Sequence, residues 1–361
     1  MEVKIEKKDI QSALKAVMPL ANAAKKSTLS GIRVMARGEK LILEASTETA
    51  GISMQVDADI LEEGWCVVDE YSFAGAIDGV KGSVCVSTGR DMVFIDDGTT
   101  RAQMPVKTQE MASMDTAHDA GIKVCGIDSI LTSCAPFASK GSARPEFAGV
   151  CMRPKDGKMT AIATNGHCLA MVDSSEPWFD SDAIIPMDVV AILRKKEWGG
   201  EIDVWRNGQN IFFFNGAATL RTACIAGRFP DIQKVVTESY NTKIKVDREY
   251  FINALKSASG FAPKVCGAVR FGLDKNKNEM NIKSFSEKGE FTTRIDAYTE
   301  GENITFCAAW MYMQTAANLC DGSWVYIRVI DNDSPIVIRG ESIDTTFVVM
   351  PVQLYFLQVR K

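Results

Sequence analysis

The sequence predicts an α+β protein built from three similar domains, and an internal repeat predicts the number of domains. A strand-like run at residues 3–6 leads into a helical segment that ends at residues 13–15. The same opening recurs at residues 244–247 and 254–256, and residues 122–124 open a further copy between them. Each copy is about 120 residues long, which is the size of a domain and far longer than a solenoid repeat.

Within each copy, short strands alternate with two amphipathic helices. After the opening strand and helix come paired strands, and then a second strand and helix at residues 66–77, 184–193 and 304–313. Further hairpins turn at residues 88–90, 207–209 and 331–333, flanked by apolar residues with a period of two. We therefore expect each domain to contain two successive β-α-β-β-β units, with both helices on one face of antiparallel sheet.

The repeat also sets the expected domain boundaries. We expect domains at residues 1–115, 121–238 and 242–361, the last with a short C-terminal extension. Polar, aperiodic segments at about residues 108–120 and 237–242 are the expected linkers. Similar domains joined end to end predict an arc or a ring; the family resemblance described below implies that the chain forms half of a ring.

Composition narrows the class of protein. A hydrophobic content of 46% with 24% charged residues is ordinary for a globular protein, and no apolar run reaches the roughly 18 residues that span a bilayer. The ten cysteines form no C-x-x-C pair, and only two histidines are present. With no signal-peptide core at the N-terminus, we expect a cytoplasmic protein with no membrane contact, no metal and no cofactor.

Basic residues gather on or near the expected helices, whereas acidic residues concentrate in turns and strand edges. For any one of these residues a solvated helix face is the simpler explanation. If all the helices share one side of an arc, however, a protein of net charge −5 acquires one positive surface suited to phosphate contact without base recognition. The predicted DNA-facing residues are Lys15, Lys25, Lys26, Lys81, Lys140, Arg144, Arg194, Lys195, Lys196 and Lys256.

Three local sequences stand out against the repeat. The middle copy places Asn165, Gly166 and His167 at a hairpin turn where the other copies have charged residues. The same copy ends in Gly-Arg-Phe-Pro-Asp at residues 227–231, and residues 347–352 read Phe-Val-Val-Met-Pro-Val. Together, in this order and spacing, they resemble the bacterial DNA polymerase III β subunit, the β sliding clamp, over essentially the whole chain.

The resemblance implies a head-to-tail homodimeric ring around duplex DNA, lined by twelve helices and without catalytic chemistry. The implied partners are double-stranded DNA bound without sequence preference, the DNA polymerase III catalytic subunit, a clamp loader, other replication and repair proteins, and a second copy of the chain. It also implies a peptide-binding cleft between the second and third domains. The matching positions are Phe147, Thr164, Gly166, His167, Leu169, Trp310, Val348, Val349, Met350, Pro351 and Val352.

The sequence departs from the family pattern in places. Cys168 stands where the family usually has arginine, which removes one polar wall of the cleft. The chain also continues through residues 355–361, and residues 353–357 are similar to the Gln-Leu-x-Leu-Phe peptides that partners insert into these clefts. We expect this tail either to compete for the cleft or to be a frayed end. Ring closure is expected from the first and third domains, near Met104, without an assigned residue pairing.

Two alternatives from other classes remain open from the sequence. Ser12 and Lys15 fit the S-x-x-K pattern of serine acyl hydrolases, although no Lys-Thr-Gly or Ser-Asp-Asn partner follows. A scaffold protein with the same domains but no ring closure is the other alternative. Hydrolysis of an ester would favour the enzyme, and retention on circular but not linear DNA would favour the clamp.

Overall fold

The structure is a computed structural model, and it describes residues 1–24, 30–108, 114, 121–139, 141, 143–174, 177–232, 235–236, 238–342 and 344–353. Its contacts divide the chain into two compact units. The first contains Met1–Ser129 and Ile185–Cys224, and the second contains Ile130–Ile184 and Ile225–Lys361. The units divide the middle repeat between them, and the three domain boundaries given above stay a prediction.

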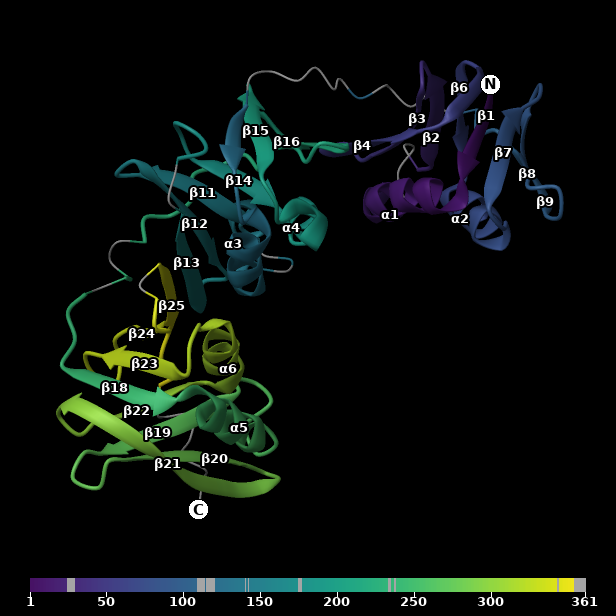
Figure 1. Cartoon of the computed structure of the whole chain (residues 1–361). Coiled ribbons are helices and arrows are strands. Elements are labelled where there is room, and N and C mark those ends of the chain that lie inside the picture. The colour runs from purple at the N-terminus through teal and green to yellow at the C-terminus, as the bar shows by residue number, and fades with distance from the viewer. Residues whose placement is uncertain are drawn as a thin grey trace. The chain divides into compact units, whose positions relative to one another are not determined.

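The first unit holds two antiparallel sheets (Figure 1). One has the strand order β5-β1-β7-β8-β9, formed by β1 (Glu2–Glu6), β5 (Asp59–Glu62), β7 (Ser83–Thr88), β8 (Met92–Asp96) and β9 (Arg101–Pro105). The other has the order β10-β15-β16-β17-β4-β3-β2-β6. Its strands are β2 (Ile32–Arg37), β3 (Lys40–Ser46), β4 (Ala50–Asp57), β6 (Gly64–Val68), β10 (Ile122–Val124), β15 (Ile202–Asn207), β16 (Asn210–Phe214) and β17 (Ala218–Ala223).

The second unit is organised around one twelve-stranded antiparallel sheet, in the order β14-β11-β12-β13-β25-β24-β23-β18-β21-β20-β19-β22. Its first part comprises β11 (Gly149–Lys155), β12 (Lys158–Thr164), β13 (Cys168–Ser174) and β14 (Ala183–Pro186). The remaining strands are β18 (Thr242–Asp247), β19 (Ala268–Asp274), β20 (Glu279–Ser286), β21 (Gly289–Gly301), β22 (Thr305–Ala309), β23 (Trp324–Val329), β24 (Ile336–Arg339) and β25 (Thr345–Val349).

Each helix buries one apolar face and exposes the opposite face. They are α1 (Lys7–Ala23), α2 (Glu70–Gly79), α3 (Ile127–Cys134), α4 (Met187–Leu193), α5 (Arg248–Ser259) and α6 (Trp310–Leu319). In α5, Phe251, Ala254, Leu255 and Ala258 are buried at the spacing of a helical stripe. Asp247 caps this helix by accepting a hydrogen bond from the Tyr250 amide at 3.0 Å. Asp69 caps α2 in the same way from Ser72 at 2.9 Å.

The structure confirms the predicted α+β class with antiparallel sheets. The repeated openings are the pairs β1–α1, β10–α3 and β18–α5, and the second strand–helix pairs are β6–α2, β14–α4 and β22–α6. None of the ten cysteines forms a disulfide among the described residues. In the part of the chain that the structure describes, no helix is long and apolar enough to cross a membrane.

Two pairings between strands that are far apart in sequence join consecutive repeats. In the first unit, β17 pairs with β4, with Leu220 opposite Ile52. In the second unit, β25 pairs with β13, with Val348 opposite Leu169. In both cases the last strand of one repeat adds to the strand after the second hairpin turn of the preceding repeat. The two pairings are therefore equivalent joints, and the second one shapes the candidate site.

Candidate functional site

A cavity of about 220 Å³ lies beside the joint between β13 and β25, inside the second unit. Its walls come from the single-turn helix η3 (Pro145–Phe147), the β12–β13 hairpin, β25 with the residue after it, and the segment after β17. The lining residues are Phe147, Thr164, Gly166, Cys168, Leu169, Pro230, Asp231, Ile232, Val235, Val348 and Met350. We call this cavity the cleft.

The β12–β13 turn is held by its own polar side chains. The Thr164 hydroxyl donates to the carbonyl of Cys168 at 2.7 Å and accepts from the Gly166 amide at 3.1 Å. The Asn165 side-chain oxygen accepts from the amides of His167 and Cys168 at 2.9 and 3.0 Å. Gly166 has a φ of +88°, which a residue with a side chain rarely adopts. These bonds fix the conformation of the turn at the rim of the cleft.

The C-terminal segment forms the opposite side of the cleft and is tied to this turn. The Met350 amide donates to the carbonyl of His167 at 2.9 Å. The side-chain nitrogen Nδ2 of Asn165 donates to the Tyr312 hydroxyl of α6 at 3.2 Å. Val348 is buried in the wall, whereas Met350 is 37% exposed. Met350 is therefore a large apolar side chain at the mouth of an apolar cavity.

Arg153 on β11 holds the segment that forms the third wall. Its guanidinium donates to Asp182 through Nε at 3.0 Å and Nη2 at 2.7 Å. It also donates to the carbonyls of Phe229 and Pro230 at 3.3 and 3.5 Å, and it lies 5.9 Å from the centre of the Phe229 ring. Phe229 in turn meets Phe147 edge to face at 6.2 Å between ring centres. These contacts hold Phe229 and Pro230 of the Arg-Phe-Pro-Asp segment close to β11.

The interior of the cleft is largely apolar and carries little charge. Leu169, Val348, Phe147 and Ile232 belong to one buried hydrophobic cluster. Burial raises the pKa of the Cys168 thiol to about 12, so this side chain is neutral near pH 7. Among the described residues of the lining, Asp231 is the one that carries a charge. Such a cavity suits apolar side chains better than ions or polar small molecules.

Six of the eleven predicted cleft residues line the cavity: Phe147, Thr164, Gly166, Leu169, Val348 and Met350. The other five lie elsewhere. His167 is exposed on the turn, Val349 is fully buried in the sheet, and Trp310 packs beside Gly267. Pro351 forms an isolated bridge to Ala308, and Val352 packs against a small cluster with Cys307.

Five residues of the lining were not among the predicted site residues: Cys168, Pro230, Asp231, Ile232 and Val235. Cys168 had been noted at a wall of the cleft, and the other four had not been assigned to it. A signal for Pro230 and Asp231 was present, because the Phe-Pro-Asp segment was recognised as a motif. For Ile232 and Val235 the sequence carries no comparable signal. Their position depends on how the segment after β17 crosses the sheet.

The predicted basic residues are only partly brought together. Lys15 of α1 and Lys195, just after α4, line one cavity of about 100 Å³ in the first unit. Arg194 and Lys196 flank Lys195 and are exposed, as are Lys81, Arg144 and Lys256 on other elements. Lys25, Lys26 and Lys140 lie outside the described residues. Ser12 lines the same small cavity as Lys15.

Comparison with known proteins supplies the family context. No protein-family model matches the chain. The beta sliding clamp of Staphylococcus aureus is 24% identical over 374 aligned positions that cover 96% of each chain. A crystal structure of the DNA polymerase III subunit beta from Pseudomonas aeruginosa superposes with a TM-score of 0.91 at 16% identity, covering 98% of this chain and 100% of that one. This chain is a distant, full-length homologue of the beta sliding clamp.

Other beta sliding clamps agree with that match. The Caulobacter crescentus pol III beta structure gives a TM-score of 0.90 at 20% identity, over 98% of this chain and 100% of that one. The beta sliding clamp of Pseudomonas aeruginosa also has a crystal structure bound to griselimycin. The resemblance inferred from the three motifs is thus confirmed, and so is the clamp fold. Beta sliding clamps are non-catalytic, which leaves the hydrolase suggested by Ser12 and Lys15 without support.

Proposed function

We propose that this protein is a DNA sliding clamp, a homodimeric ring that encircles duplex DNA and keeps a DNA polymerase on its template. The full-length match to beta sliding clamps is the observation that carries this proposal. The proposal includes a cytoplasmic location, a separate clamp loader that opens the ring, and replication and repair proteins that share the cleft. It requires no cofactor and no catalytic group.

Unpaired strand edges support ring closure by a second copy. Two equivalent joints, β17–β4 and β25–β13, link consecutive repeats. The strand that corresponds to β17 and β25 in the first repeat is β9, which ends its sheet among the described residues. The strand that corresponds to β4 and β13 in the third repeat is β21, whose residues 289–296 pair with β20 alone in the described chain. Such edges are prone to pair with another chain.

The internal repeat also gives a register for that pairing. The β8–β9 and β16–β17 hairpins close with the same spacing, so Ala102 corresponds to Leu220. The β3–β4 and β20–β21 registers make Phe291 correspond to Ile52. Because Leu220 lies opposite Ile52, we expect Ala102 of one copy opposite Phe291 of the other. Gln103 then lies opposite Glu290, and Met104 opposite Gly289.

The cleft is the proposed docking site for polymerase and for other partners. Burying one leucine or phenylalanine side chain contributes about 1.5–3 kcal/mol, so two anchors contribute about 3–6 kcal/mol. Main-chain hydrogen bonds must supply the rest of the roughly 8 kcal/mol that micromolar affinity requires. A short peptide with two large apolar side chains therefore fits the proposed use of this cavity. The cluster of Lys15, Arg194, Lys195 and Lys196 supports non-specific contact with phosphates.

The deciding experiment combines solution mass with DNA retention. Light scattering should give about twice the chain mass of 39.5 kDa. Protein loaded on nicked circular DNA should stay bound through a gel-filtration column and be released when the circle is linearised. Phe291→Asp should reduce the dimer fraction, whereas Lys288→Asp in the neighbouring turn should leave it unchanged. A persistent monomer at micromolar concentration, or equal loss from circular and linear DNA, contradicts the clamp and favours a scaffold protein.

A further inference from the structure

The segment that leaves each repeat is held by the same backbone hydrogen bond in all three repeats. One amide of the segment donates to the carbonyl two residues before the N-cap of the second helix of that repeat. The donor and acceptor pairs are Lys107 with Val67 at 2.8 Å, Ile225 with Ile184 at 2.9 Å, and Val352 with Cys307 at 2.8 Å. We call the eight residues that begin at each donor the exit segment: residues 107–114, 225–232 and 352–359. Val352 is therefore the counterpart of Ile225.

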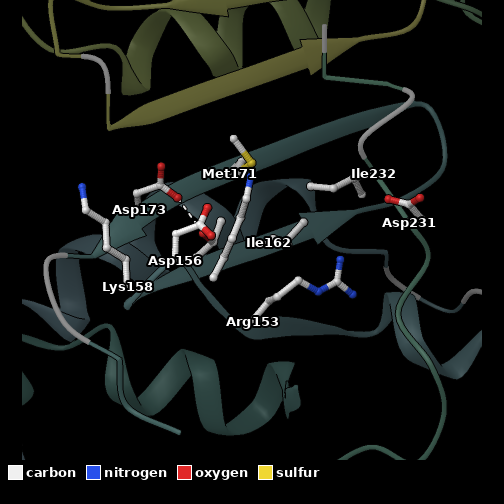
Figure 2. A pocket seen from close by; sticks show the side chains of 10 residues that line it. Arg153, Asp156, Lys158, Ile162, Met171, Asp173, Asp231 and Ile232 are labelled. Carbon is white, nitrogen blue, oxygen red and sulfur yellow. Dashed lines mark hydrogen bonds between the residues drawn. The ribbon is translucent and has the colours of Figure 1, made fainter. Parts of the chain in front are cut away.

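In the second repeat, the exit segment packs two apolar side chains against the sheet. Phe229 and Ile232, four and seven residues after the donor Ile225, belong to one buried hydrophobic cluster. Ile232 and Asp231 line both the cleft and a second pocket, of about 320 Å³, over β11, β12 and β13. Figure 2 shows these two residues on one side of that pocket, with Ile162 in the middle. One short segment of chain therefore separates the two cavities.

Met114 of the first repeat, seven residues after its donor, takes the place of Ile232. The sulfur of Met114 lies 2.9 Å from the position that a Cβ on Gly51 would occupy. Gly51 is the equivalent of Leu169, because both follow the second hairpin turn at the same spacing and both pair with the last strand of the next repeat. Ile232 and Leu169 line the cleft together. The residue seven positions after the donor thus lies against the same strand position in both repeats.

The third repeat has the same apolar spacing in its exit segment and an apolar surface beside it. Phe356 and Val359 follow Val352 by four and seven residues, and residues 354–361 lie outside the described part of the chain. Val352 itself packs on a small cluster whose other members are Cys266, Ala268, Phe285 and Cys307. We call these four residues the tail surface. Two of them, Cys266 and Phe285, are only partly buried, so the tail surface still presents apolar area to water.

Two positions show how the tail surface corresponds to the site that Phe229 occupies. Cys266 precedes β19 by two residues, as Phe147 precedes β11, and Phe147 meets the Phe229 ring edge to face at 6.2 Å. Gly272 is the fifth residue of β19, as Arg153 is of β11. The third repeat therefore keeps an apolar contact site but lacks the guanidinium that binds the carbonyls of the exit segment in the second repeat.

We propose that the C-terminal tail is the exit segment of the third repeat and docks on the tail surface, with Phe356 against Cys266. The occupant is this chain's own terminus, because Val352 already brings the chain to the surface and the following residues carry the required spacing. A tethered segment meets its site at a high effective concentration, which offsets the missing arginine. A tail held in this place does not compete for the cleft.

A disulfide-trapping experiment on the full-length protein tests where the tail lies. Phe356→Cys should form an intrachain disulfide with Cys266 under copper–phenanthroline oxidation, mapped by peptide mass spectrometry. Tyr355→Cys is the matched control, because its counterpart in the second repeat, Arg228, is exposed, and it should cross-link about fivefold more slowly. A disulfide from position 356 to Cys168 would place the tail in the cleft, and equal rates for the two variants would show a free tail. Either result overturns the proposal.

Thiol exposure gives a second readout that needs no new cysteine. Deleting residues 355–361 should raise the rate at which iodoacetamide modifies Cys266 by about threefold to tenfold, because the deletion removes the ring that covers the sulfur. Exposed Cys125 should react at an unchanged rate. The affinity of a Gln-Leu-Ser-Leu-Phe peptide for the cleft should be the same for both proteins. An unchanged rate at Cys266, or tighter peptide binding after the deletion, would contradict docking on the tail surface.

Discussion

Leu169 on β13 lies directly opposite Val348 on β25, although the two residues belong to different repeats, and both side chains face the same cavity. The cleft therefore forms where strand pairing joins two repeats. Any change that opens this pairing should remove the site and weaken the fold together. Side chains at the mouth of the cavity are better probes, because the strand pairing does not depend on them.

Met350 is the first such probe. Met350→Asp places a carboxylate at the mouth of an apolar cavity, so we expect peptide affinity to fall at least tenfold and polymerase stimulation to be lost. The fold should be kept, because the side chain is 37% exposed. Met311→Asp on α6, where methionine is 47% exposed and outside the cleft lining, is the matched control. Equal loss of binding in both variants would place the docking site elsewhere.

Arg153 should act as a positioning residue for the third wall of the cleft. Arg153→Met removes the bonds to Asp182 and to the carbonyls of Phe229 and Pro230, at a cost of about 1–3 kcal/mol. Amide exchange at Ile232 should become faster and peptide binding weaker. Arg101→Met, which breaks the exposed pair with Asp96, should change neither measurement. Unchanged exchange at Ile232 in the first variant would show that the wall is held by its apolar contacts alone.

A buried ion pair in the first unit gives a prediction about stability. Arg33 on β2 lies opposite Glu44 on β3, with 3.6 Å between their charged atoms. At the equivalent positions the next repeat has Cys151 opposite Ile162. Glu44→Ile alone leaves Arg33 buried without its partner and should cost about 3–5 kcal/mol in the free energy of unfolding. Adding Arg33→Val should restore the lost stability and raise the free energy of unfolding by up to about 4 kcal/mol above that of the original protein. Additive losses in urea unfolding would contradict this coupling.

The pH dependence of this pair follows from the pKa of Glu44. Burial raises that pKa above the ordinary value of 4.5, and the attraction of Arg33 lowers it by less. Protonation of Glu44 is therefore easier in the folded protein than in the unfolded chain. The contribution of Glu44 to stability is fully present below pH 4.5 and is lost as the pH rises through the folded-state pKa. The variant with both Glu44→Ile and Arg33→Val lacks this carboxyl. Its free energy of unfolding should therefore not show the Glu44 contribution to the difference between pH 4 and pH 7.

Thiol reactivity should distinguish Cys168 from Cys125. Cys168 is buried and burial raises its pKa to about 12, so little thiolate forms below about pH 10. Cys125 is exposed. At pH 8, iodoacetamide should modify Cys125 first, as measured by peptide mass spectrometry, and Cys168 should react only on unfolding. Because the raised pKa disfavours ionisation in the fold, the contribution of Cys168 to stability should decline as the pH rises from about 9 toward 12.

The basic cluster beside α1 and α4 gives the last prediction. Replacing Arg194, Lys195 and Lys196 together by Glu should weaken retention on circular DNA at 50 mM salt and leave the dimer mass unchanged. The loss should be the same for unrelated duplex sequences, because phosphate contacts carry no base information. A triple change at Lys275, Lys277 and Lys288, on hairpin turns of the third repeat, is the matched control. Retention that depends on one short sequence would contradict sliding.

Parts of the cleft were predictable and others were not, for physical reasons. Gly166 and the residues around it stand out because a turn with positive φ needs glycine and short polar side chains, and these requirements are local. Trp310 and Val352 were assigned to the cleft by resemblance, yet one packs on Gly267 and the other beside Cys307. Sequence spacing does not fix side-chain direction past a strand end, where the regular alternation of faces stops.

The sequence by itself determined the repeat, the α+β class and the order of strands and helices, because apolar periodicity and turn residues act over a few positions. Only the tertiary structure decided that Leu169 meets Val348, that Ile232 separates two cavities, and that Lys15 and Lys195 share a third. These contacts join residues tens to hundreds of positions apart. They arise when exposed strand edges pair and apolar faces are buried, and no local pattern in the chain encodes which edge meets which.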